Sequence, residues 1–406
     1  MMVWPGGDIH VYQPQQRKYL TMGVYDKVTY SGGSGAIPTQ ITITKKNQVR
    51  YVFDKLAGSP TGELLHLIRI EDRHGNAITL NYEDGFSENT DINIKRLKRV
   101  NDPQGRYFEY SYADQTNLIN RIDSKAGNIE CSISFSYNGG KLTNYTNPKG
   151  DLTTYHYGKN IATEHLIYSI VLPRGNTITN TYSANRKLQS TAFTGGTKTI
   201  IDARPEYTAQ GIRTKSETTT VVDGRTIKSS VVLNDLGAPV TSTGPMKQDS
   251  IAYADSRHPL LPTYIEDKVK DVVTKIEYDA NGNPTLTRVE SAGKVLETRT
   301  TYNSRNDIIS QTDARGNTSF YQYNGLGQLT ELKAPIGTTV FIPNTNGTVR
   351  QVTNPTGIVT KYGYNAFGNQ TSAALPEQIE TRQDWDSAGR LIAKWDARGT
   401  KTLLAY

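Results

Sequence analysis

Short runs of alternating polar and apolar residues, each ended by a turn sequence, fill most of this chain. The clearest example is the segment 313–329. It opens with Asp first and Gly fourth in the turn Asp313-Ala-Arg-Gly316, as type I turns prefer. Tyr321 and Tyr323 then share one face of the next six residues with Ser319, which predicts a strand. A second turn at 324–327 precedes the start of a return strand.

The same unit recurs at near-constant spacing, which predicts a repeat architecture. Gly316, Gly357 and Gly399 close equivalent turns that lie 41 and 42 residues apart. Aromatic residues also precede turns like the one at 324–327. Their successive separations are 21, 41 and 21 residues: Tyr302, Tyr323, Tyr364 and Trp385. The elementary period is therefore 21 residues, with one degenerate copy near Phe341.

The turn after each aromatic residue needs one residue with a positive φ angle, which Gly accepts and Asn tolerates next best. The fourth position after the aromatic residue holds one of these two residue types in each regular copy: Gly282, Asn306, Gly327, Gly368 and Gly389. We expect hairpins with tight turns at these positions. We also expect aromatic rings one period apart to stack along the sheet.

These patterns predict an all-β fold of repeated antiparallel β-hairpins in a continuous coiled sheet, a β-solenoid or shell segment. Strands are clearest at 40–44, 49–53, 218–222, 229–233 and 379–385. We divide the chain into irregular N-terminal strands (1–63), hairpin repeats (64–190), degenerate repeats that lose the Tyr and Gly punctuation (191–275) and regular repeats (276–406). All four segments are expected to form one continuous repeat domain, because each repeat packs only on its neighbours.

Composition and charge narrow the function classes. Hydrophobic residues make up 35% of the chain and 25 residues are Tyr, which suits half-buried strands better than a thick aliphatic core. The net charge of +7 comes from interspersed residues without a basic block, so we expect no nucleic-acid partner. We expect no membrane span, because no apolar run approaches ~18 residues. No secretory signal peptide is visible.

We expect no catalytic, cofactor-binding or metal-binding residues and no cofactor. The six histidines show no metal-ligand spacing: His10, His66, His74, His156, His165 and His258. His156 is expected on the solvent face of a strand. The segment 279–283 could suggest calcium, but turn capping by Asp279 explains it better. Cys131 alternates with apolar residues, which favours a buried structural residue over a nucleophile.

The tyrosine-Asp/Asn-Gly signature resembles the YD repeat of the Rhs family, which includes bacterial Rhs toxins, the C components of toxin complexes and the teneurins. It is seen in Tyr278-Asp-Ala-Asn-Gly282, Tyr323-Asn-Gly-Leu-Gly327 and Trp385-Asp-Ser-Ala-Gly389. The resemblance covers most of residues 64–406. It implies a strip of hairpins that forms a hollow shell around a C-terminal toxin in bacterial members.

The resemblance therefore implies a non-enzymatic shell segment of a toxin or effector used in bacterial competition. Its partners would be a toxin cargo polypeptide, the remainder of the shell and secretion-apparatus components, and it would act as a secreted or cell-surface protein. Family members release the toxin with an Asp-Pro motif, but Asp102-Pro103 lies in an ordinary repeat turn and is not expected to be proteolytic. A cell-surface adhesin or carbohydrate-binding repeat array is the alternative, because tyrosines can stack on sugars.

Overall fold

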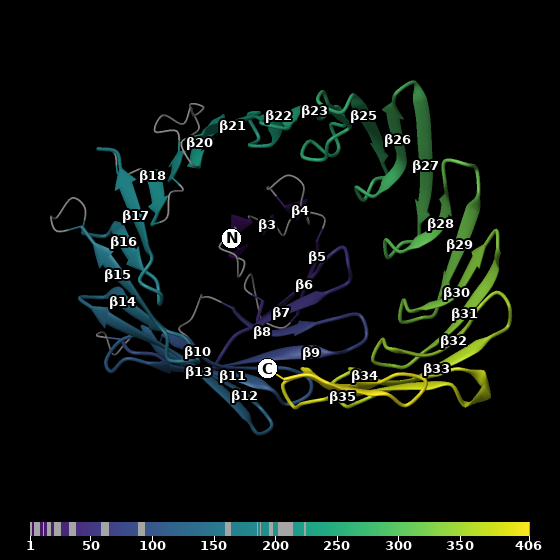
Figure 1. Cartoon of the computed structure of the whole chain (residues 1–406), viewed down its shortest axis with the longest axis horizontal. Helices are drawn as coiled ribbons and strands as arrows, with labels where there is room; N and C mark the ends of the chain where they lie inside the picture. The colour runs from purple at the N-terminus through teal and green to yellow at the C-terminus, as the bar shows by residue number, and fades with distance from the viewer. Residues whose placement is uncertain are drawn as a thin grey trace. The chain divides into compact units, whose positions relative to one another are not determined.

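The structure is a computed structural model of the chain. It describes residues 2–3, 9–10, 12–13, 18–19, 26–31, 38–57, 65–87, 94–158, 164–184, 186, 188–194, 198–201, 214–222 and 225–405. Within these residues nearly all regular structure is β-strand, and a single 3-10 turn, η1 (Pro376–Gln378), is the exception. Figure 1 shows the strands following one another from purple through green to yellow.

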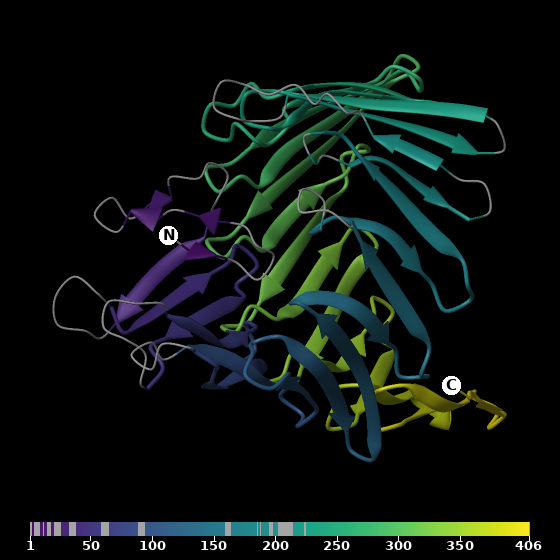
Figure 2. The same ribbon diagram turned by 90° about the vertical axis from the view of Figure 1, so that its left-hand side faces the viewer.

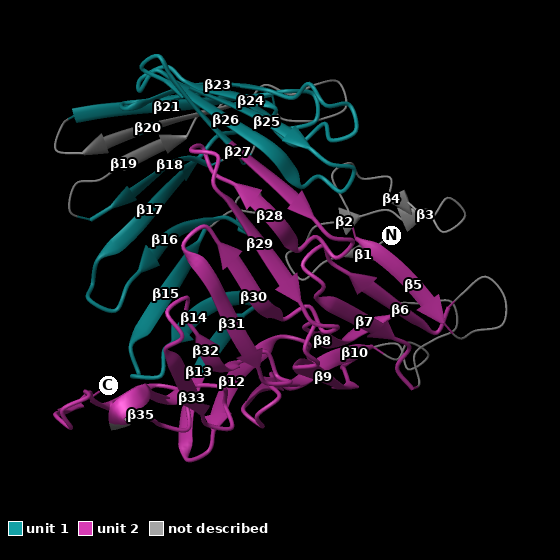
Figure 3. Cartoon of the chain, turned by 90° about the vertical axis from the view of Figure 1, so that its right-hand side faces the viewer, with its two compact units in different colours: residues 1–24, 133–297 teal, residues 25–132, 298–406 magenta. Residues whose placement is uncertain are grey.

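The chain forms two compact units, coloured separately in Figure 3. Unit 1 comprises residues 1–24 and 133–297, and unit 2 comprises residues 25–132 and 298–406. Two strands cross the unit boundaries, β13 (Ile129–Asn138) and β27 (Lys294–Tyr302).

Unit 1 holds two small two-stranded sheets and a long antiparallel series (Figure 2). Its short N-terminal strands are β1 (Met2–Val3), β2 (Ile9–His10), β3 (Tyr12–Gln13) and β4 (Lys18–Tyr19). The series continues through β14 (Lys141–Thr146), β15 (Leu152–Tyr157), β16 (Ile167–Val171), β17 (Thr177–Tyr182), β18 (Leu188–Phe193), β19 (Lys198–Ile201), β20 (Lys215–Val222), β21 (Arg225–Leu233), β22 (Pro239–Gly244), β23 (Lys247–Ala252), β24 (Tyr264–Asp267), β25 (Val272–Tyr278) and β26 (Pro284–Ser291).

Unit 2 consists of two runs of strands from distant parts of the chain. The N-terminal run is β5 (Lys27–Ser31), β6 (Gln40–Thr44), β7 (Arg50–Asp54), β8 (His66–Glu71), β9 (Ala77–Asp84), β10 (Lys95–Asn101), β11 (Tyr107–Tyr112) and β12 (Ile119–Ala126). The C-terminal run follows β27 with β28 (Ile308–Thr312), β29 (Thr318–Tyr323), β30 (Leu329–Ala334), β31 (Gly337–Pro343), β32 (Val349–Thr353), β33 (Val359–Tyr364), β34 (Gln370–Ala374), β35 (Glu380–Trp385), β36 (Leu391–Trp395) and β37 (Lys401–Leu403).

Consecutive strands pair antiparallel, and the pairing follows a fixed pattern. Between β28 and β29 it covers the three pairs nearest the turn and ends at Ser310 opposite Phe320. Between β29 and β30 it extends to Tyr323 opposite Leu329, with a register shift just before the tyrosine. Such a shift is a β-bulge, which leaves one residue of the longer strand unpaired and increases the local twist. The all-β fold of repeated antiparallel hairpins expected from the sequence is confirmed.

One five-residue turn joins most of these strands, and Asp313–Asn317 shows its geometry. The amide of Asp313 donates to the carbonyl of Asn317 (2.9 Å), and that of Gly316 donates back to the carbonyl of Asp313 (3.0 Å). The Asp313 carboxylate accepts the amides of Arg315 and Asn317, both at 2.9 Å. Every predicted positive-φ position is confirmed, with angles of 70°, 65°, 77°, 76° and 80° at Gly282, Asn306, Gly327, Gly368 and Gly389.

The sheet has little covered interior. Among the described residues, the buried hydrophobic side chains are Ile43, Ala126, Ala238 and Ala393. In β29, Tyr321 and Tyr323 are half-buried while Phe320 on the opposite face is 51% exposed. The expectation of half-buried strands in place of a thick core is confirmed, so main-chain and turn hydrogen bonds carry much of the architecture.

The structure corrects one expectation. Cys131 is exposed, not buried. It lies near the start of β13, and the regular alternation of burial begins only at Ile133, so the apolar pattern of the strand does not extend back to the cysteine. Within residues 191–275, Gly237 has a φ of 79° in a repeat turn that opens at Asn234.

Candidate functional site

A hydrogen bond from an aromatic side chain to a main-chain carbonyl recurs along the chain, and we call it the aromatic–carbonyl bond. In β29 the hydroxyl of Tyr323 donates to the carbonyl oxygen of Ile308 at 2.8 Å. In β33 the hydroxyl of Tyr364 donates to that of Val349, also at 2.8 Å. The same bond is made by Tyr82 to Leu67, Tyr112 to Leu97, Tyr182 to Ile167, Tyr253 to Pro239, Tyr278 to Pro262 and Trp385 to Gln370.

The bond spans the place where two neighbouring strands separate. Pairing between β28 and β29 stops at Ser310 opposite Phe320, so Ile308 lies beyond the last pair. The bulge that directly follows Ile308 in its pairing with β27 also disturbs the ladder on the other side. The Tyr323 hydroxyl therefore supplies a donor to a carbonyl at the opened end of the strand pair, where an unpaired carbonyl would cost free energy.

The chemistry of the bond explains which residues occupy the aromatic position. The side chain must be long and half-apolar, and it must donate a hydrogen bond from its far end. Tyr and Trp, the aromatic residues of the regular copies, meet all three requirements. The indole nitrogen of Trp385 reaches the Gln370 carbonyl at 2.7 Å. Tyr323 and Tyr364 are two periods apart, so they do not test the expected stacking of rings one period apart, which stays a prediction. Their rings point back to the preceding strands.

Burial affects the ionisation of these phenols. Burial raises the pKa of Tyr323 above the usual value for tyrosine, with smaller contributions from Asp307 and Tyr321 in the same direction. Burial also raises the pKa of Tyr364, and the contact with Val349 opposes it. The protonated phenol is thus the form that the folded chain favours, as its role as a donor requires.

The degenerate copy has proline at the aromatic position. Pro343 pairs with Val349 across a register shift, just as Tyr323 pairs with Leu329. Proline has neither a ring donor nor a main-chain amide hydrogen. In this copy the side-chain amide of Gln328 instead donates to the carbonyl of Asn344 at 2.6 Å, so it joins the two successive turns.

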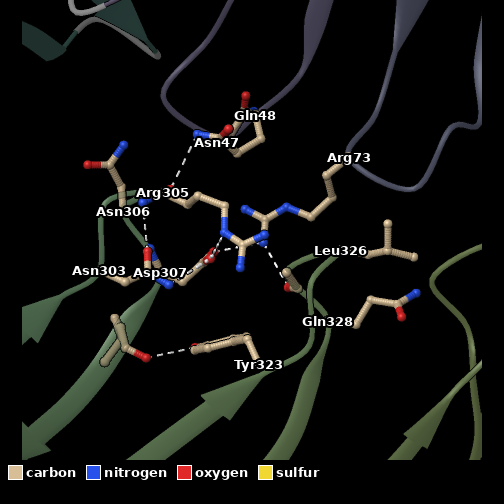
Figure 4. Close-up of polar contacts among 12 residues, drawn as sticks. Asn47, Gln48, Arg73, Asn303, Arg305, Asn306, Asp307, Tyr323, Leu326 and Gln328 are labelled. Carbon is tan, nitrogen blue, oxygen red and sulfur yellow. Dashed lines mark hydrogen bonds and ion pairs between the residues drawn. The ribbon is translucent and has the colours of Figure 1, made fainter.

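The two strand runs of unit 2 meet through their turns, and we call this contact the turn interface. Arg73, from the turn between β8 and β9, donates to the carboxylate of Asp307 (2.7 Å) and to the carbonyl of Gly327 (2.9 Å). Figure 4 shows its guanidinium between these two turns. The Asp307 side chain is only 9% exposed, so this ion pair is well shielded from solvent.

Other turns extend the interface on both sides of Arg73. Asn306 donates to the carbonyl of Lys46 (3.3 Å), and Gln48 donates to the carbonyl of Arg305 (3.4 Å). Asn76 donates to the carbonyl of Asn346 at 3.0 Å. Further along, the Arg106 guanidinium lies 5.4 Å from the ring centre of Phe367.

The turn interface also explains why position 347 holds glycine. A Cβ atom added to Gly347 would lie 2.5 Å from His74 Cδ2, closer than any real contact. Gly316 has a similar φ angle of 84°, but nothing lies within 4 Å of a Cβ there. Gly347 thus serves both the turn and the close approach of another turn, whereas Gly316 serves the turn alone.

Asp279 and Asp102 cap repeat turns, and His156 lies in β15. The Asp279 carboxylate accepts the amides of Asn281 (2.8 Å) and Asn283 (2.9 Å) in a repeat turn. His156 is exposed. Asp102 also caps its turn by accepting the amides of Gln104 and Arg106.

The remaining histidines fall into separate settings. His258 is 2% exposed and contacts the Asp279 carbonyl at 2.7 Å. Burial, followed by the charge of Lys95, lowers the pKa of His66. His165 lies 3.2 Å from Glu164, and His10 lies in β2. No group of three or more His, Cys, Asp or Glu residues in the described part of the chain is placed to hold a metal ion.

The aromatic–carbonyl bond and the turn interface were not anticipated from the sequence. The recurrence of tyrosine marked the positions of the first, but not its partner. Nothing in the local pattern marked Arg73, because arginine also occurs in turns where it makes no such contact. Where the structure is described, no helix is long and apolar enough to cross a membrane.

A protein-family model described as RHS Repeat matches residues 302–339 and 344–378. No curated protein matches the chain. Among solved structures, the complex TcdB2-TccC3-Cdc42 aligns with 11% identity over 95% of this chain and 26% of that one, with a TM-score of 0.44. A Tc holotoxin pore of Photorhabdus luminescens aligns with 11% identity over 95% of this chain and 24% of that one, with a TM-score of 0.40.

The chain thus spans about a quarter of the length of these structures. The family match lies within the most regular part of the series, from β27 to η1, where the aromatic–carbonyl bonds of Tyr323 and Tyr364 are found. Residues 302–339 and 344–378 are therefore RHS repeats, and the resemblance to the Rhs and YD-repeat family that the sequence predicts is confirmed.

Proposed function

We propose that this chain is a non-enzymatic structural segment of an Rhs-type toxin or effector, and that it encloses or shields a toxic polypeptide. The observation that carries the proposal is the aromatic–carbonyl bond, which recurs with RHS repeats and closes the opened end of successive strand pairs. A wall that must hold back a polypeptide needs a continuous sheet without gaps, because an open strand end offers unpaired main-chain groups to other chains.

The placement of the ionisable groups supports a structural role. Asp279 and Asp313 use their carboxylates to cap turns, and Asp307 pairs with Arg73 across the turn interface. These carboxylates hold main-chain geometry, which is what a wall requires. The proposal extends to the whole chain: residues 1–63, 64–190, 191–275 and 276–406 form one continuous repeat domain.

The proposed partners are the toxin cargo, the remainder of the shell and components of a secretion apparatus, and the site of action is outside the producing cell. The alternative, a carbohydrate-binding array, needs rows of aromatic side chains free to stack on sugars. The rings of Tyr82, Tyr323 and Tyr364 instead direct their hydroxyls into the strand network. A glycan-array screen separates the two functions, since a shell without sugar ligands gives no hits.

A proteolysis experiment tests the shielding function. An unfolded reporter peptide with several trypsin sites is fused to the C-terminus of the full chain, and its cleavage rate is compared with that of the same reporter added as a separate molecule. We expect the fused reporter to be cut more slowly than the free one. The same fusion carrying Arg73→Ala, which weakens the turn interface, should lose part of this protection. Equal cleavage of fused and free reporter would rule out shielding by this chain.

A further inference from the structure

The degenerate repeat contains a cleft where the regular repeats contain an aromatic ring. The cleft has a volume of about 440 Å³ and is lined by Tyr323, Leu329, Phe341, Pro343, Val349 and His74, among other residues. Its volume lies within the range of about 300 to 1,000 Å³ that is usual for small-molecule sites. All of its lining residues belong to unit 2.

Pairing identifies Pro343 as the aromatic position of this copy. Tyr323 and Pro343 each lie just after a register shift, and each pairs with the residue six positions later, across a turn closed by Gly327 or Gly347. The rings of Tyr323, Tyr364 and Trp385 each donate to the residue that pairs with the aromatic position of the preceding copy. Tyr302 pairs with Ile308, which accepts from Tyr323, and Pro343 pairs with Val349, which accepts from Tyr364.

The same relationship assigns an acceptor to the degenerate copy. Tyr323 pairs with Leu329, so a tyrosine at position 343 would donate to the carbonyl of Leu329. Proline cannot do this, and Leu329 lines the cleft. His74 also lines the cleft. The cleft thus combines apolar walls with a main-chain acceptor.

We propose that this cleft binds a phenol ring, such as the side chain of a tyrosine, whose hydroxyl donates to the Leu329 carbonyl. The ring would take the place that Tyr323 and Tyr364 occupy in their own copies, with Phe341 and Val349 against its faces. The proposal does not depend on the shell function, since it rests on the geometry of one repeat. The phenol can come from a small molecule or from a tyrosine of a polypeptide, and the two sources share this chemistry.

The test uses the full chain and p-cresol, which is the side chain of tyrosine as a free molecule. Binding is followed by NMR titration and by the shift of the melting temperature. We expect saturable binding of p-cresol and about 5- to 10-fold weaker binding of 4-methylanisole, which has the same ring but no donor. A short peptide of Gly and Ser around one Tyr, compared with its Phe counterpart, shows whether a polypeptide tyrosine also enters.

The variant Pro343→Tyr supplies the missing ring from the chain itself. We expect it to raise the melting temperature and abolish p-cresol binding, whereas Ile336→Ala, at an 86% exposed position outside the cleft lining, leaves binding unchanged. Absence of saturable p-cresol binding, equal binding of 4-methylanisole, or full binding in a folded Pro343→Tyr variant would each overturn the proposal. The comparison of the two ligands on the unmodified chain remains decisive if Pro343→Tyr does not fold.

Discussion

The hydroxyl oxygen of Tyr323 lies 2.8 Å from the carbonyl oxygen of Ile308, fifteen residues earlier in the chain. The strand pair that contains both residues has already ended at Ser310 opposite Phe320. The tyrosine therefore does what a further ladder hydrogen bond would do, but across a wider gap. The periodic recurrence of tyrosine therefore has a structural reason. The aromatic position of each regular copy must hold a ring that carries a hydrogen-bond donor at its far end.

Tyr323→Phe should destabilise the chain although it removes only one oxygen atom. The change leaves the Ile308 carbonyl without its side-chain donor, at a cost of about 1 to 2 kcal/mol in the free energy of unfolding. Tyr321→Phe is the matched control, because Tyr321 lies on the same strand face and its hydroxyl makes no such bond in the structure. Urea unfolding followed by circular dichroism measures both. Equal effects of the two substitutions would contradict a specific role for the Tyr323 hydroxyl.

High pH should weaken the same bond. Burial raises the pKa of Tyr323 in the folded chain, so the unfolded chain, with a tyrosine pKa of about 10, loses its proton first as the pH rises. The stability that this group contributes is thus complete below pH ~10 and is lost as the pH passes through the higher folded value. The difference in unfolding free energy between the natural chain and Tyr323→Phe should shrink from pH 8 to pH 11. A constant difference would show that the phenol does not titrate with folding.

Arg73→Ala should destabilise unit 2 more than a typical surface substitution. It removes the nearer cation of the Asp307 carboxylate, which is only 9% exposed and keeps Arg305 at 3.9 Å. It also removes the donor to the Gly327 carbonyl. We expect a loss of about 2 to 3 kcal/mol in the free energy of unfolding. Arg73→Lys keeps the charge but not the fork of donors, so it should recover only part of the loss.

An arginine on the exposed surface is the control for this prediction. Arg382 pairs with Glu380 on its own strand while its side chain is 69% exposed, so Arg382→Ala should cost under about 1 kcal/mol. Thermal unfolding of the three variants gives the ranking. If Arg73→Ala and Arg382→Ala have the same melting temperature, the turn interface contributes nothing measurable to the stability of the chain.

The turns could be predicted from the sequence, because a capping Asp or Asn and a Gly at the fourth position act within five residues. The strand predicted at 40–44 is β6 (Gln40–Thr44), and Asn306 was found as the substitute for Gly from its spacing alone. The pair of Arg73 and Asp307 could not be predicted, because 234 residues separate them and no local pattern depends on the contact.

The sequence pattern locates the degenerate copy but does not predict the cleft. It placed the degenerate copy near Phe341, two residues from Pro343, because the spacing of the rings was visible while their donor role was not. Cys131 was misplaced for a related reason. Alternation along a strand says which residues share a face, but not how far along the strand that face is covered.

Gly347→Ala should cost more stability than Gly316→Ala. Both residues have positive φ angles, 93° and 84°, so each substitution carries the strain of a left-handed backbone, about 1 to 2 kcal/mol. Only at Gly347 would the new methyl group collide with another turn, at His74. We expect a melting temperature several degrees lower for Gly347→Ala than for Gly316→Ala. The reverse order would mean that the approach of His74 to Gly347 is not tight in solution.

Acid should reveal the difference between Asp and Asn as turn caps. Hydrogen bonds from the Asn317 side chain, then from the amides of Asn317 and Arg315, lower the pKa of Asp313 in the folded chain. The stability from this carboxylate is therefore present above the unfolded pKa of about 4 and is lost as the pH falls through the lower folded value. Asp313→Asn keeps an oxygen acceptor, as Asn354 does in its own turn, but cannot titrate.

We expect Asp313→Asn to fold and to be less stable than the natural chain at pH 7, because charged acceptors make stronger hydrogen bonds. The gap should close as the pH falls from 5 to 3, since only the natural chain loses its cap. The reciprocal change Asn354→Asp should add acid sensitivity at an equivalent turn. Urea unfolding at pH 3, 5 and 7 measures both variants. A gap that stays constant across this range would show that the two turns hold their geometry without the carboxylate charge.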